Sequence, residues 1–148
     1  SAKASNAFKN ALDLNPYNNR AWNSYGLSLI DLGEFDGALT AFQTAANLND
    51  YEFEALSNLG LLQSMLERHT EAIETFEKAV KRLQQNKDGS IKADKRSAAE
   101  LYTNMGVTLC DLGRYNEAMV VFAKAVVIDS TFYDAARNLQ AVREAIAK

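Results

Sequence analysis

Asparagine is the residue type whose spacing in this chain suits recognition chemistry. Asn58, Asn104 and Asn138 hold the same place in a repeated framework, and Asn23 stands one position away from it. A carboxamide offers two N–H donors and an acceptor oxygen, so one side chain can pair with both the N–H and the C=O of a peptide. A regular row of asparagines is therefore a candidate device for holding the backbone of another polypeptide.

Residues for covalent or metal chemistry do not form a set. The only histidine, His69, is expected at the surface, and the only cysteine, Cys110, has no histidine at a matching helical position. Acidic residues show no metal-ligand spacing, and Gly33 and Gly113 suit helix ends rather than a phosphate loop. We therefore expect no enzyme, no cofactor and no metal, with Cys110 serving as a small apolar contact.

The composition restricts the class of protein further. The chain has 148 residues and a net charge of −3, which argues against nucleic acid as a partner. No apolar run approaches the ~20 residues of a membrane span, so no membrane insertion is expected. A single cysteine excludes an intrachain disulfide and favours a cytoplasmic location.

A framework of three glycines organises the chain. Gly26 and Gly60 are 34 residues apart, and Gly106 follows after 46, which is 34 plus 12. Large side chains stand four and one residues before each glycine, alanines stand 12 and 19 residues after it, and a phenylalanine stands 16 after it. The framework residues are Trp22, Tyr25, Ala38, Phe42 and Ala45; Leu56, Leu59, Ala72, Phe76 and Ala79; and Tyr102, Met105, Ala118, Phe122 and Ala125.

These offsets predict a pair of amphipathic helices in each copy. At ~100° per residue, the positions before and at the glycine share one side of a first helix, and the later positions share one side of a second. The side chains expected in the core are Trp22, Tyr25, Phe42, Leu59, Phe76 and Phe122. Gly33 and Gly113 are expected to end first helices, and the expected N-caps of the second helices are Asp36, Thr70 and Asn116.

The pattern Trp22-x2-Tyr25-Gly26-x2-Leu29, followed by Ala38-x3-Phe42, resembles the tetratricopeptide repeat. The second copy departs at Gln63, where a large apolar residue is usual, and lacks the Asp-Leu-Gly turn of the other two. The resemblance implies an all-α fold, a right-handed superhelical solenoid of antiparallel helix pairs. An ordinary helical bundle is the alternative.

The same frame divides the chain into six segments. These are a second helix of a partial repeat over 1–16, repeat 1 over 17–52, repeat 2 over 53–86, an inserted basic loop over 87–96, repeat 3 over 97–130 and a C-terminal capping helix over 131–148. Ser97-x2-Glu100 is a capping-box start for repeat 3. The loop suits either a docking patch or a solvated surface. Because the chain begins inside a repeat, it can be a fragment, and the unpaired helix with Phe8 and Leu12 is expected to allow weak self-association.

The resemblance also implies a binding surface, because the first helices of this family line a concave groove. The predicted peptide-binding residues are Arg20, Asn23, Leu27, Glu54, Asn58, Leu61, Glu100, Asn104, Val107, Asp111, Arg137 and Asn138. The whole groove-facing side carries two basic and six acidic residues, a net of −4, which favours a partner peptide with basic residues. Ordinary solvated helix ends are the alternative explanation of this charge.

We therefore expect a protein–protein interaction module that binds an extended peptide segment through the asparagine ladder. Chaperone-binding members of the family use lysine and asparagine three residues before and one residue after the glycine. The basic residues are missing here, so a chaperone C-terminal tail is not expected as the ligand; these positions hold Asn23 and Leu27, Ser57 and Leu61, and Thr103 and Val107. The alternative function is a structural scaffold subunit that assembles end to end or through its convex face in a larger complex.

Overall fold

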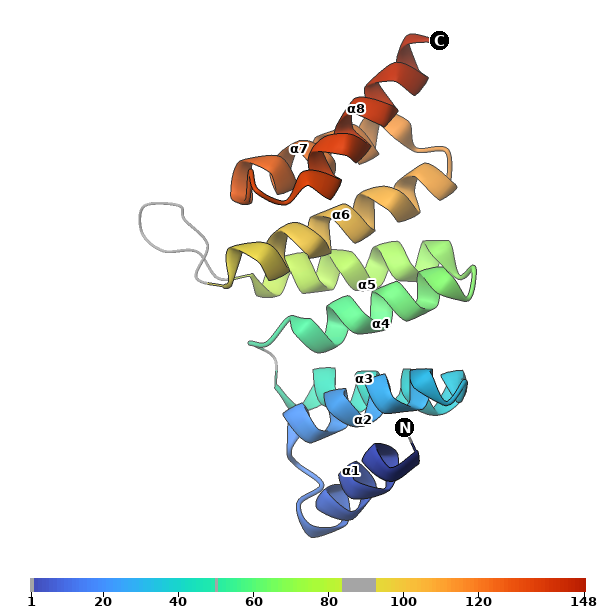
Figure 1. Ribbon diagram of the computed structural model, residues 1–148, viewed down its shortest axis with the longest axis vertical. Coiled ribbons are helices and arrows are strands. Elements are labelled where there is room, and N and C mark those ends of the chain that lie inside the picture. The colour runs from blue at the N-terminus through green and yellow to red at the C-terminus, as the bar shows by residue number, and fades with distance from the viewer. Residues whose placement is uncertain (1, 50, 84–92) are drawn as a thin grey trace.

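The computed structural model describes residues 2–49, 51–83 and 93–148, and within these ranges it contains eight helices and no strand. The helices are α1 (Ala2–Leu14), α2 (Asn19–Asp31), α3 (Phe35–Leu48), α4 (Glu54–Met65), α5 (His69–Arg82), α6 (Lys95–Asp111), α7 (Tyr115–Ile128) and α8 (Tyr133–Ala147). They stack along one long axis, with α1 and α8 at opposite ends and antiparallel pairs α2–α3, α4–α5 and α6–α7 between them (Figure 1). The expected helical solenoid is confirmed.

Each helix pair is built around a glycine of the first helix and a phenylalanine of the second. The pairs are Gly26 with Phe42, Gly60 with Phe76 and Gly106 with Phe122. A Cβ on these glycines would lie only 2.6, 2.7 and 2.4 Å from the facing ring. The three rings are fully buried, as expected from the sequence. Glycine is therefore required so that the ring can lie against the backbone of the first helix.

The expected burial of Trp22 and Tyr25 is wrong, whereas that of Leu59 is confirmed. Both aromatic side chains are half-buried and pack against each other, with ring centroids 6.1 Å apart. The Trp22 indole Nε1–H donates to the backbone C=O of Pro16 at 2.7 Å. Because this N–H needs a partner, the ring stays at the rim of the core, next to the α1–α2 turn.

The expected N-caps of the second helices are also wrong. α3, α5 and α7 begin one residue before Asp36, Thr70 and Asn116, so these three side chains lie inside the first turn. The residues that stand at the cap positions make no side-chain capping hydrogen bond. The second helices therefore depend on packing rather than on capping for their start.

The start of α6 differs from the expected boundary at residue 97. Asp94 is the N-cap, and its carboxylate accepts from the backbone N–H of Ser97 at 3.0 Å. Lys95 and Arg96 therefore belong to the helix and not to the basic loop expected over 87–96. Residues 87–92 of that loop lie outside the described residues.

A hydrogen-bonded turn recurs where one repeat joins the next. The side-chain oxygens of Asn15, Asn49 and Asp129 accept from the backbone N–H two residues later, at 3.0–3.1 Å. Asn15 and Asn49 are 34 residues apart, one repeat length. Leu83 stands 34 residues after Asn49, at the equivalent position of repeat 2, and directly precedes the segment that lengthens this repeat. The extra residues thus follow a side chain that has no oxygen to accept this bond.

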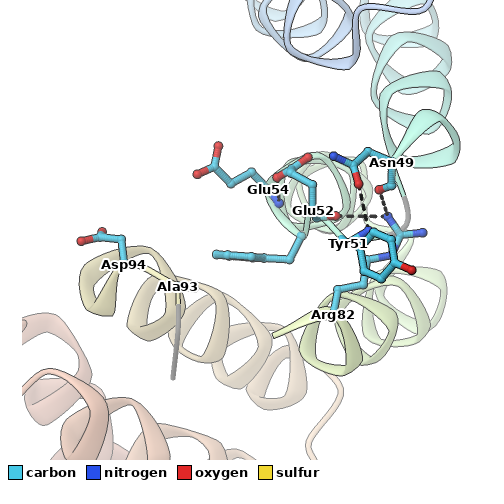
Figure 2. A pocket seen from close by; sticks show the side chains of 8 residues that line it. Asn49, Tyr51, Glu52, Glu54, Arg82, Ala93 and Asp94 are labelled. Atoms are coloured by element: carbon cyan, nitrogen blue, oxygen red, sulfur yellow. Dashed lines mark hydrogen bonds between the residues drawn. The ribbon is translucent and has the colours of Figure 1, made fainter. Parts of the chain in front are cut away.

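Arginine side chains hold two of these junctions. Arg82 Nη1 donates to the backbone C=O groups of Ala46, Asn49 and Glu52 at 2.9, 3.2 and 3.1 Å, and Figure 2 shows it among the junction residues. At the α7–α8 junction, Arg96 Nε donates to the Asp129 carboxylate at 3.0 Å. These bonds satisfy carbonyls that end α3 and tie neighbouring repeats together.

Repeat 2 ends its first helix without glycine. Glu67 adopts a φ of 64°, the left-handed conformation that Gly33 and Gly113 adopt at the same place with a φ of 75°. This conformation costs an L-residue about 1–2 kcal/mol because its Cβ approaches the backbone. Glu67 is therefore strained where the other two copies are not.

Replacing Glu67 with glycine should stabilise the protein by about 1 kcal/mol. Glycine removes the steric cost of the left-handed conformation, but part of this gain is offset because glycine loses more backbone entropy on folding. Chemical denaturation would measure the change. Glu67→Ala is the control, because it removes the charge but keeps the Cβ. A Glu67→Gly variant no more stable than Glu67→Ala would contradict the strain.

Gly106→Ala should destabilise the α6–α7 pair, although alanine is the better helix former, because the new methyl group overlaps the Phe122 ring. Combining it with Phe122→Leu, which makes the facing side chain smaller, should cost less than the sum of the two single changes. A double-mutant cycle by thermal and chemical unfolding would measure this coupling. Additive costs would show that the ring does not determine the glycine.

Candidate functional site: the face of the first helices

The side of α2, α4, α6 and α8 that points away from the core is here called the first-helix face. It presents a row of apolar side chains. Leu27, Leu61 and Val107 follow the framework glycines directly and are 46, 39 and 43% exposed. Met65, also on this side of α4, is exposed as well. Large apolar residues held at the same register outside the core are typical of a contact surface.

Beside this row lie the asparagines, and they fall into two groups. Asn58 Nδ2 donates to Asn23 Oδ1 at 2.9 Å, which links α4 to α2. Asn23 thus reaches the row despite its displacement by one position in the sequence. Asn104 and Asn138 are half-buried, and their side chains make no hydrogen bond within the described part of the chain. Two carboxamides are therefore paired with each other, and two have donors and acceptors to offer.

A second polar link on this face was not anticipated from the sequence. Ser64 Oγ and Thr108 Oγ1 lie 2.9 Å apart and join α4 to α6. Thr108 is buried, and its hydroxyl also lies 3.0 Å from the C=O of Asn104. Thr103, expected on the groove side, is buried too, because its hydroxyl turns inward to the C=O of Ala99 at 2.8 Å. No spacing in a single helix reveals such pairs, since each depends on how two helices meet.

The charged residues predicted for the site are exposed. Arg20, Glu54, Glu100 and Asp111 all face solvent. Arg137 forms an ion pair with Asp134, three residues earlier on α8. Its charge is therefore largely neutralised on its own helix, and the acidic side chains predominate on the rest of the face.

The candidate nucleophile on this face is not activated. Cys110 is half-buried; burial, and secondarily the neighbouring Asp111 carboxylate, raise the pKa of its thiol. His69 begins α5, and its Nδ1 is buried without a hydrogen-bond partner among the described residues. The described residues contain no group of three His, Cys, Asp or Glu side chains that could hold a metal ion. Within the same ranges, no helix combines the length and apolar character needed to cross a membrane.

A cavity of about 380 Å³ lies at the junction of repeats 1 and 2, where Glu54 of the first-helix face borders it (Figure 2). Tyr51, Glu52 and Glu54 line it from one segment, Arg82 from α5 and Asp94 from the start of α6. Burial raises the pKa of Glu52, while hydrogen bonds from the backbone N–H groups of Glu54 and Ala55 act in the opposite direction. This cavity has no signature in the sequence, because three separate segments meet to form it.

Two family profiles described as tetratricopeptide repeat match residues 17–85 and 98–128. No sequence among curated proteins matches the chain significantly. The first matched range includes Gln63 and Glu67, two of the positions at which repeat 2 departs from the other copies.

Solved structures similar to this chain have the same architecture. The crystal structure of MamA superimposes with a TM-score of 0.78 at 20% identity, covering 97% of this chain and 77% of that one. YrrB, described as a TPR protein with an unusual peptide-binding site, gives 0.75 at 21% identity, covering 94% and 66%. The first TPR of Spaghetti (RPAP3), bound to the HSP90 peptide SRMEEVD, gives 0.74 at 16% identity, covering 88% and 94%. With its glycine–phenylalanine pairs, its matched profiles and this shared architecture, the chain belongs to the tetratricopeptide repeat family.

Proposed function

We propose that this protein is an interaction module that binds an extended peptide segment of a partner along the first-helix face. The observation that carries the proposal is the register of this face. The carboxamides of Asn104 and Asn138, which have no partner among the described residues, stand beside the exposed apolar row. A peptide needs both kinds of contact, since carboxamides pair with its backbone while apolar surface receives its side chains.

The spacing of the helices suits an extended ligand. Packed helices lie ~8–10 Å apart, and an extended chain advances ~3.3 Å per residue, so about three ligand residues span one repeat. The asparagines would then contact the peptide backbone once per repeat. The side chains of Asn104 and Asn138 make no hydrogen bond with other described residues, so all their donors and acceptors are available to a ligand. Asn23 and Asn58 already form one hydrogen bond with each other. We therefore expect the C-terminal half of the face to hold the peptide backbone more tightly.

Charge favours a peptide with lysine or arginine. Glu54, Glu100 and Asp111 are exposed beside the apolar row, and Arg137 is engaged by Asp134. An acidic surface attracts basic side chains and accelerates their association, and salt screens the effect over ~8 Å at physiological ionic strength. Peptide binding by the Spaghetti TPR and the description of YrrB support the class of ligand, although the basic residues of chaperone-binding members are missing here.

A second candidate function is a scaffold subunit that docks through the convex face. On α7, Val120 and Val127 are 52 and 85% exposed. The corresponding places are polar in the other second helices: Thr40 and Asn47 in α3, and Glu74 and Lys81 in α5. Self-association through residues 1–16 belongs to the same candidate, since Leu14 at the end of α1 is also exposed.

The triple variant Asn58→Ala, Asn104→Ala, Asn138→Ala should bind peptide over a hundredfold more weakly than wild type. Each lost hydrogen bond contributes about 1 kcal/mol, and each 1.4 kcal/mol corresponds to about tenfold. Random dodecapeptides displayed on phage would be selected on the wild-type protein, and the consensus peptide titrated by fluorescence anisotropy at two salt concentrations. We expect basic residues in that peptide and weaker binding at higher salt.

The matched control removes three exposed asparagines elsewhere, Asn6, Asn10 and Asn116, and should bind as wild type does. If the triple asparagine variant binds as tightly as wild type, the asparagines of the first-helix face do not hold the peptide. Loss of binding in Val120→Lys, Val127→Lys would then favour the convex-face candidate.

A further inference from the structure

A second cavity, here called the repeat 2 cavity, lies where repeats 1 and 2 meet, and none of the predicted peptide-binding residues lines it. It measures about 310 Å³ and lies between α3 and the end of α4 with its following turn. Its lining residues are Leu39, Thr40, Gln43, Thr44, Leu59, Gln63 and Arg68. One of them, Gln63, stands where this repeat departs from both other copies, and Arg68 directly follows the strained Glu67.

Gln63 takes the place that Leu29 and Leu109 take in the other repeats. The hydroxyl of Thr75, which is buried in α5, donates to Gln63 Oε1 at 2.7 Å. The same hydroxyl lies 3.0 Å from the C=O of Glu71, and we assign its single hydrogen to the shorter contact. With its oxygen bound to Thr75, the carboxamide keeps its nitrogen and two hydrogens without a partner among the described residues.

Arg68 can be compared with Arg114, which stands at the same place in repeat 3. Arg114 Nε donates to the Glu117 carboxylate at 3.0 Å. Arg68 also has a glutamate three residues later, Glu71, yet it forms no ion pair within the described ranges. Arg68 instead lines the cavity, and among the described lining residues it is the only charged one.

The other lining groups are three polar side chains of α3 and two leucines. The hydroxyls of Thr40 and Thr44 donate to backbone C=O groups four residues earlier, so each keeps only acceptor lone pairs. Gln43 Nε2 donates one of its two hydrogens to Asn47 and keeps the other. Leu39 and Leu59 add apolar surface. A carboxylate on a short apolar stem meets the arginine, the free amide hydrogens and the leucines, because its oxygens can accept from arginine and amide while its CH₂ groups contact the leucines.

We propose that the repeat 2 cavity is a carboxylate-binding site formed by Arg68 and the Gln63 amide, which takes an acidic side chain of a polypeptide or a small free carboxylate. It is independent of the peptide-binding proposal, since it lies on a different side of α4 and has the opposite charge preference. The acceptor oxygens of Thr40 and Thr44 can receive the backbone N–H groups of a polypeptide ligand, which free acetate does not have.

The test is a ¹⁵N NMR titration of the whole chain at constant ionic strength. The probes are acetate and the blocked tripeptides Ac-Ala-Glu-Ala-NH₂ and Ac-Ala-Gln-Ala-NH₂, with sodium chloride as the reference. We expect saturable shifts of the Gln63 side-chain amide and the Arg68 Nε–H with acetate and the glutamate peptide, but not with the glutamine peptide. Tighter binding of the glutamate peptide than of acetate assigns the site to a polypeptide, and equal binding assigns it to a small carboxylate.

Two variants and a matched control make the test decisive. Arg68→Met should weaken binding about tenfold or more, since a charge-assisted bond is lost. Gln63→Leu installs the residue of the other two repeats, so it should fold and lose the response of the site. Arg114→Met, at the same place in repeat 3, should titrate as wild type does. Absence of saturation at Gln63 and Arg68, or an Arg68→Met variant that titrates like wild type, would overturn the proposal.

Discussion

The contact between a glycine of each first helix and a phenylalanine of each second helix is the constraint on which the rest of the structure depends. The ring lies so close to the glycine backbone that even a methyl group would overlap it. This close approach sets the separation of the two helices, and its repetition gives all three pairs the same geometry. Because the pairs are alike, residues at the same offset from the glycine line up along the stack, which places Leu27, Leu61 and Val107 in one row.

Repeat 2 keeps this constraint but departs from the other two copies at Gln63, Glu67 and Thr75. Its core carries the hydrogen-bonded pair Gln63 and Thr75 where other copies carry apolar side chains, and its first helix ends on the strained Glu67. Polar pairs and strained backbone reduce stability unless something compensates, and such violations of local rules are often found at functional sites. Gln63 lines the same cavity as Arg68, and Glu67 directly precedes Arg68 in the sequence.

The junctions between repeats decide how the first helices are presented to a ligand. Arg82 ties the end of α3 and the following turn to α5 through three carbonyls, and Arg96 ties α6 to the α7–α8 turn. Charged donors satisfy these groups more strongly than water-exposed neutral ones would. Neighbouring repeats thus keep one orientation, and the asparagines and apolar residues of adjacent helices keep a constant spacing.

The sequence by itself determined the repeat frame, because the close contact of Gly60 with Phe76 and its equivalents permits few residue types at fixed offsets. Helix type and the exposed apolar row followed from that periodicity. Tertiary structure alone decided the rest. The bond between Asn23 and Asn58 joins residues 35 positions apart on two different helices. Thr103 turns inward because its hydroxyl donates to the C=O of Ala99. Trp22 is half-buried because its indole N–H donates to a carbonyl in the preceding turn. Such contacts join segments whose meeting no single-helix period encodes, and the cavity between Gln63 and Arg68 exists only because α3 packs beside them.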